Sequence, residues 1–193
     1  LLPALAATFA LQLKYFLNLR ADVITSCCGS LFSEQGPTLA SEASGMEAKP
    51  AILLFYVALG VAVFANALHA GLRRRWSGIF AALASAAGFV AALVGILSFV
   101  SLYVYEHPHH HCPFCLLKPE YGYQGYLLYV PLFVSTAAGV GAGVLQPFAG
   151  VGSLAALVPR ASGRLAAVAA TGFALFAAVA TFMVLKSNLI LFS

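Results

Sequence analysis

The chain has 193 residues, of which 62% are hydrophobic and only 8% are charged. Soluble domains carry about a quarter charged residues, so this composition excludes a water-soluble globular protein and predicts an integral membrane protein in contact with lipid. The formal net charge of +4 does not indicate binding of nucleic acid, because the basic residues are spread thinly apart from Arg73, Arg74 and Arg75.

Five apolar stretches have about the length that a helix needs to cross a bilayer, roughly 17 to 25 residues. In chain order they are 1–19, 51–71, 78–105, 126–145 and 165–185. Lys14 lies inside the first stretch, where its amine could reach the headgroups; the alternative for this stretch is an amphipathic helix on the membrane surface. The sequence therefore predicts an all-α polytopic helix bundle, with residues 1–193 forming a single transmembrane domain.

Charge in the connections predicts the orientation of this bundle. Arginines occupy the connections 72–77 and 146–164, and neither contains an acid. Because Lys and Arg in short loops favour the cytoplasmic side, we expect the N-terminus inside and the C-terminus outside. The loops 20–50 and 106–124, which hold all six acids and all four cysteines, are then extracytoplasmic.

Two pairs of residues inside the predicted spans carry structural information. Asn66 and His69 are three apart and so share a helix face. They could satisfy each other against a neighbouring helix, or His69 could contact a haem or a quinone. Gly139 and Gly143 are four apart, a spacing that favours close contact with another helix.

The densest group of reactive side chains lies in residues 106–115, with the sequence Glu-His-Pro-His-His-His-Cys-Pro-Phe-Cys. Cys112 and Cys115 form a C-x-x-C motif that we expect directly before an apolar helix. A helix N-terminus and a neighbouring imidazolium both lower the pKa of a thiol, so His111 would favour the reactive thiolate. The motif predicts a redox pair with Cys112 as the exposed attacking thiol and Cys115 as its partner.

The other two cysteines, Cys27 and Cys28, are adjacent in the loop 20–50. A disulfide between neighbours closes a strained ring, so we expect each to exchange with Cys112 or Cys115. Such exchange would relay electrons between the two loops and on to a lipid-soluble acceptor such as a quinone. The alternative is one or two static disulfides that hold the two loops together.

The same segment also predicts a metal site. Imidazole suits copper, zinc and iron, and thiolate selects copper(I) or zinc, so two of each could close a tetrahedral site. Pro108 keeps the histidines extended, so some of their rings would be solvated instead of ligating. Haem is a further possibility, although the motif lacks the histidine that follows c-type attachment cysteines. The candidate ligands are His107, His109, His110, His111, Cys112 and Cys115.

The order of these features resembles membrane thiol oxidoreductases of the vitamin K epoxide reductase type and, more loosely, the bacterial disulfide-bond membrane oxidase. In the former family a loop cysteine pair lies between the first two spans, and a C-x-x-C lies at the start of the fourth, beside a quinone. Cys27 and Cys28, and Cys112 and Cys115, occupy these places, although the family's loop cysteines are spaced apart. The resemblance implies a bacterial inner-membrane protein. The tail after Lys186 is shorter than the thioredoxin-like domain of bacterial members, so a separate redox partner is expected.

The sequence therefore leads to one function with two alternatives. The first is thiol–disulfide exchange on the extracytoplasmic side, linked to a quinone or to another membrane or extracytoplasmic redox protein. The second is a copper-, zinc- or haem-binding membrane subunit. The third is an accessory subunit of a larger membrane complex, in which the disulfides are structural.

Overall fold

The computed structural model describes residues 11–14, 48–106 and 113–188, and all regular structure in these ranges is helical. Within them, four helices are long and apolar enough to cross a membrane. They are α3 (Ala48–Leu72), the continuous helix formed by α4 (Arg75–Gly95), η1 (Ile96–Val100) and α5 (Ser101–Tyr105), α6 (Gln124–Val144) and α7 (Leu157–Lys186). This confirms that the described part of the chain is all-helical and that four of the predicted spans correspond to helices that could cross a membrane. The expected span 1–19 lies outside the described residues, apart from a helical stretch at 11–14.

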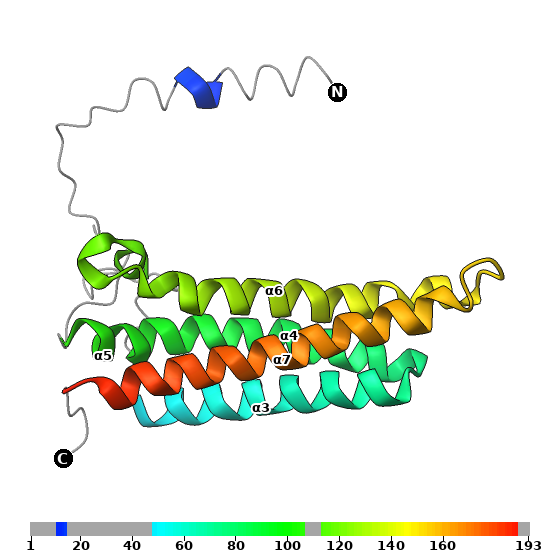
Figure 1. Ribbon diagram of the computed structural model, residues 1–193, viewed down its shortest axis with the longest axis horizontal. Coiled ribbons are helices and arrows are strands. Elements are labelled where there is room, and N and C mark those ends of the chain that lie inside the picture. The colour runs from blue at the N-terminus through cyan, green and yellow to red at the C-terminus, as the bar shows by residue number, and fades with distance from the viewer. Residues whose placement is uncertain (1–10, 15–47, 107–112, 189–193) are drawn as a thin grey trace.

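The four long helices form a bundle in which each has two main neighbours. α3 packs on α4, α4 on α6, α6 on α7, and α7 back on α3, so the contacts close a ring. Figure 1 shows the helices side by side along the long axis, with α5 and the last turns of α7 at the same end. Neighbours around the ring run antiparallel, because each long helix starts at the end of the bundle where the one before it in the chain finishes (Figure 1).

Two helix boundaries differ from the prediction. The arginine turn is shorter than 72–77, because α3 continues to Leu72 and α4 begins at Arg75. The connection 146–164 is also shorter: α7 begins at Leu157, so Arg160 and Arg164 lie in its first turns. Arginine is a good helix former, and its long side chain reaches water from a helix end, so charge alone does not end a helix.

The centre of the bundle is filled by phenylalanines from three helices. Phe55 of α3 meets Phe99 edge to face with ring centroids 5.3 Å apart, and its centroid lies 5.7 Å from that of Phe176 on α7. These three rings and Phe173 are fully or almost fully buried. Between helices surrounded by lipid the drive for association is dispersion and close fit, so this aromatic cluster supplies contact area where these three helices meet.

Glycines set the distance between α4 and α6. A Cβ atom built on Gly139 would collide with Ser85, and one built on Gly143 would collide with Ala82. Both partners lie on α4, so the predicted contact of these two glycines with another helix is confirmed. Backbones can approach this closely only where a side chain is missing on one of them.

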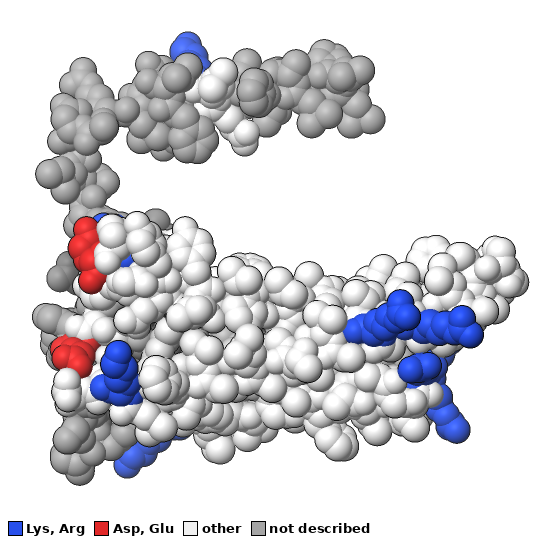
Figure 2. Space-filling view, viewed as in Figure 1, with Lys and Arg blue, Asp and Glu red and all other residues white. Residues whose placement is uncertain are grey.

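Charge is distributed unequally between the two ends of the bundle, as Figure 2 shows. One end, where α3 turns into α4 and where α7 begins, carries Arg73, Arg74, Arg75, Arg160 and Arg164. The other end carries both acids of the described residues, Glu106 and Glu120, together with Lys186 at the end of α7. The thiol motif lies at this acidic end, between α5 and α6.

Candidate thiol site and lipid-facing groove

Two of the predicted site residues fall in the described part of the chain, and the structure places them at opposite ends of the bundle. Cys115 lies at the acidic end, after α5, and His69 lies near the end of α3, beside the arginine turn. The other predicted site residues lie outside the described residues: Cys27, Cys28, His107, His109, His110, His111 and Cys112.

Cys115 begins a short 3₁₀ turn, Cys115–Leu117, whose backbone groups form hydrogen bonds within the loop. The amide of Lys118 donates to the carbonyl of Cys115 at 3.0 Å. A second 3₁₀ turn, Pro119–Tyr121, follows, and α6 begins only at Gln124. The expectation that the motif directly precedes an apolar helix is therefore wrong. Pro119 and the left-handed Gly122 (φ 61°) interrupt the chain before a helix can start, so α6 lends no N-terminal field to Cys115.

The loop that carries Cys115 is held tightly against α6. The hydroxyl of Tyr129 donates a hydrogen bond of 2.8 Å to the carbonyl of Pro113. A Cβ atom on Gly125 would lie 3.0 Å from the carbonyl carbon of Leu116, so the first turn of α6 approaches the loop because Gly125 has no side chain. Leu116 is fully buried and Cys115 is only 5% exposed. The thiol of Cys115 therefore lies inside the protein, and an external disulfide cannot reach it without loop opening.

An apolar groove of about 630 Å³ runs beside this loop on the outer surface of the bundle. Phe114, Val130 and Phe133 on its walls are 60%, 55% and 54% exposed, so the groove opens sideways, toward the lipid. Part of its wall is the π-helical turn η1, a distortion that is frequent at functional sites. The groove is lined by Leu93, Ile96 and Leu97, by Pro113, Phe114 and Leu117, and by Tyr126, Tyr129, Val130, Phe133 and Val134.

The groove and the C-x-x-C motif share residues. Pro113 and Phe114, the two residues between the cysteines, both line the groove. Leu117, two residues after Cys115, lines it as well. Cys115 is itself buried, and in the sequence it lies between these lining residues. An apolar molecule in the groove therefore lies against the loop that carries the thiol.

His69 is fully buried in a polar network that joins three of the four long helices and the turn after α6. Ser77 donates to the carbonyl of Arg74, so its oxygen accepts a 2.8 Å bond from Nδ1 of His69. Nε2 then accepts from the hydroxyl of Ser162 at 3.2 Å and from the amide of Gln146 at 3.4 Å. Both ring nitrogens thus have protein partners, and a haem or quinone at His69 would have to displace one of them.

Asn66 is not bonded to His69, although the two share a helix face. Its side-chain amide donates to the carbonyl of Ala62 and to the hydroxyl of Ser85, each at 2.8 Å. Each residue therefore finds its own partners, and both use a neighbouring helix. The partners Ser77, Ser85, Gln146 and Ser162 were missed in the sequence; their one signal is that they are isolated polar residues in or beside apolar stretches.

In the described ranges no group of three or more His, Cys, Asp or Glu side chains is placed to hold a metal ion. The predicted ligands at 107–112 lie outside these ranges, so the metal-site prediction is not tested.

No protein-family model, no curated protein and no solved structure matches the chain. Its class rests on the structure itself: a helical chain that, in its described part, has four helices long and apolar enough to cross a membrane.

The hydrogen bond from Tyr129 gives a first testable prediction. Tyr129→Phe removes the donor to Pro113 and leaves that carbonyl without its partner, which lowers the cost of opening the loop by about 1 kcal/mol. We expect Cys115 to react with a maleimide about fivefold faster as a result. Tyr126→Phe is the matched control, because Tyr126 lines the same groove and its hydroxyl makes no described bond to the loop. Equal rates in the two variants would contradict the anchoring role.

Proposed function

We propose that the protein is a membrane thiol oxidoreductase that passes electrons from its C-x-x-C pair to a quinone in the lipid-facing groove. The observation that carries this proposal is the shared wall: Pro113 and Phe114 belong both to the motif and to the groove. A quinone needs an apolar, aromatic-lined site that it can enter from the bilayer. The groove of about 630 Å³ lies within the size range of small-molecule sites, about 300–1,000 Å³.

The proposed topology has five spans, with the N-terminus inside and the C-terminus outside. The arginines gathered at one end of the bundle support a cytoplasmic location of that end. The loop that carries Cys112 and Cys115 (the thiol loop) and the entrance of the groove are then on the extracytoplasmic side, where disulfides persist. A bacterial inner membrane, in which quinones are lipid-soluble carriers, is the corresponding location.

The burial of Cys115 supports a division of labour between the two cysteines. In the oxidised pair, an incoming thiolate, from Cys27, Cys28 or a redox partner, attacks the sulfur of Cys112, and Cys115 leaves as a thiolate. A second thiolate displaces Cys112, so the donor becomes a disulfide and the pair becomes two thiols. The pair then gives two electrons and two protons to the quinone, which becomes a quinol, and the disulfide re-forms. His111 would stabilise the thiolate of Cys112.

The test is to fill the groove without touching the core. Val134 lines the groove and is half exposed, so Val134→Trp places an indole in the ligand's space. We expect the KM for a short-chain quinone to rise about tenfold, the size of effect that about 1.4 kcal/mol of lost binding gives. Exchange with a soluble dithiol is expected to stay at the wild-type rate. Both reactions are measured with protein reconstituted in nanodiscs.

Val144→Trp is the matched control, because Val144 is a lipid-facing valine of the same helix that does not line the groove. Equal effects of the two substitutions would overturn the quinone site. A protein whose thiols are not oxidised by any quinone would overturn the activity. Stoichiometric copper, zinc or haem in the purified protein would support the metal-binding alternative instead.

A further inference from the structure

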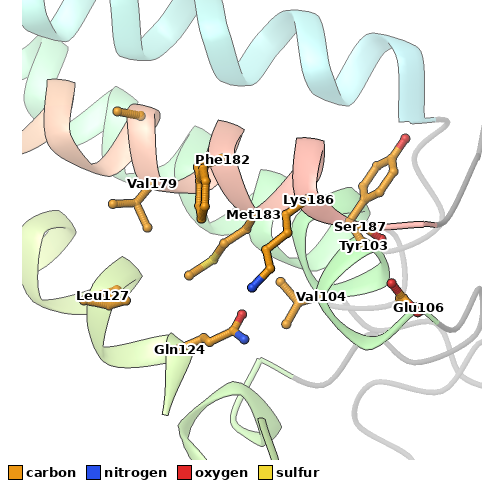
Figure 3. Close-up of a pocket in the computed structure, with 11 residues that line it drawn as sticks. Tyr103, Val104, Glu106, Gln124, Leu127, Val179, Phe182, Met183, Lys186 and Ser187 are labelled. Carbon is orange, nitrogen blue, oxygen red and sulfur yellow. The ribbon is translucent and has the colours of Figure 1, made fainter. Parts of the chain in front are cut away.

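A second cavity, of about 540 Å³, lies at the acidic end between α5, α6 and α7 (Figure 3). Its deeper wall is apolar and its rim is polar. The apolar wall includes Leu127, Val179, Phe182 and Met183, and the rim includes Glu106, Gln124, Lys186 and Ser187. We call it the rim cavity. None of its residues belongs to the groove or to the C-x-x-C motif.

The two charges on the rim have opposite signs and do not form an ion pair with each other. In Figure 3 the amine of Lys186 points into the cavity toward Gln124, and Glu106 lies apart from it. One oxygen of Glu106, Oε1, accepts hydrogen bonds from the backbone and side-chain amides of Asn188, at 3.0 and 3.2 Å. Within the described residues Lys186 has no acidic partner. The rim therefore offers a cation with a neighbouring amide donor and, separately, a carboxylate with a second oxygen.

The apolar wall extends from the rim along α7 in the direction that the acyl tail of a bound lipid would take. Val179, Phe182 and Met183 lie in the two turns of α7 before Lys186, so they are deeper in the membrane than the rim. Phe182 is 65% exposed, which leaves this wall open to an acyl chain along α6 and α7. A molecule that fits the whole cavity has a polar head at the helix ends and a hydrocarbon tail along them.

We propose that the rim cavity binds a zwitterionic phospholipid with a primary ammonium, phosphatidylethanolamine. Its phosphate accepts from Lys186 and Gln124, and its ammonium donates to the remaining oxygen of Glu106. A purely anionic headgroup satisfies Lys186 but faces Glu106 with like charge. A choline headgroup carries no N–H to donate to the carboxylate. A lysine that merely reaches the headgroup layer would favour anionic lipid, so headgroup preference separates the two explanations.

The test measures binding of lipids with identical eight-carbon tails to the purified full chain by native mass spectrometry. The wild-type protein is expected to bind the ethanolamine lipid roughly fivefold more tightly than the glycerol or choline lipids, the effect of about one charge at the membrane surface. Glu106→Gln keeps Oε1 for Asn188 and is expected to remove that preference or reverse it toward the glycerol lipid. Lys186→Gln is expected to weaken binding of all three lipids roughly fivefold.

Lys49→Gln is the control for Lys186, because Lys49 lies at the same end of the bundle, on α3, and does not line the cavity. Wild-type preference for the glycerol lipid, or an unchanged preference in Glu106→Gln, would overturn the proposal. An effect of Lys49→Gln equal to that of Lys186→Gln would also overturn it. Thermal unfolding of each variant in detergent shows whether the bundle is intact. Lipid binding is read without any thiol or quinone reaction, so this result is separate from that of the proposed activity.

Discussion

Cys115→Ser is expected to lower the rate of quinone reduction by about two orders of magnitude or more, because an alcohol cannot share a disulfide with Cys112. Mixed with an oxidised partner, the same variant is expected to accumulate a mixed disulfide, because the thiolate of Cys112 attacks the partner's disulfide and releases one of its thiolates. Cys115 is the buried partner that would normally release such an intermediate, and serine cannot do so. Non-reducing gels with a maleimide mass tag measure the mixed disulfide, and absorbance of the quinol measures the rate.

The complementary variant distinguishes the roles of the two cysteines. Cys112→Ser is expected to lose quinone reduction to the same extent but to trap no mixed disulfide, since the remaining thiol of Cys115 is only 5% exposed. A mixed disulfide through Cys115 in this variant would show that the buried thiol is the one that exchanges, and the assignment would be wrong. At position 115 serine places a hydroxyl in a buried site, which costs about 1–3 kcal/mol if it is unbonded, so thermal unfolding of both variants is the control for folding.

Hydropathy was sufficient to predict four helices that could cross a membrane, because a helix that crosses a bilayer must be apolar over about 20 residues wherever it packs. It was less informative about where helices end. Arg160 and Arg164 marked a loop in the sequence, yet both lie in α7. The length of an apolar stretch follows the thickness of the lipid layer, whereas a helix continues as long as its backbone hydrogen bonds continue.

The candidate site was predictable only where it is local in sequence. The C-x-x-C motif is visible in four residues, but the groove beside it needs α4, η1, the thiol loop and α6 together. His69 was visible as a polar residue in a span, whereas its bond to Ser162 joins residues 93 positions apart. The close approach of α6 to the loop at Leu116 depends on Gly125, and no pattern in the sequence relates that glycine to the loop.

Gly139→Ala is expected to lower the free energy of unfolding by about 1–3 kcal/mol, the usual cost of forcing a methyl group into a closely packed interface. The added Cβ atom would collide with the side chain of Ser85 on α4. Gly141→Ala is the matched control on the same helix. Its Cβ atom would lie 3.6 Å from Leu165, an ordinary contact, so we expect a change of less than about 1 kcal/mol in the stabilising direction. Unfolding in mixed micelles of detergent measures both.

The same pair of variants links the helix contact to the groove. Leu93 of α4, Ile96 of η1 and Val134 of α6 all line the groove, and Gly139 lies just over one turn beyond Val134. Pushing α4 and α6 apart at Gly139 should therefore widen the groove and raise the KM for quinone, whereas Gly141→Ala should leave it unchanged. If Gly139→Ala destabilises the bundle but Gly141→Ala changes the KM equally, the groove is not shaped by this contact. If neither variant affects stability, α4 and α6 are not held at the distance that Gly139 and Ser85 indicate.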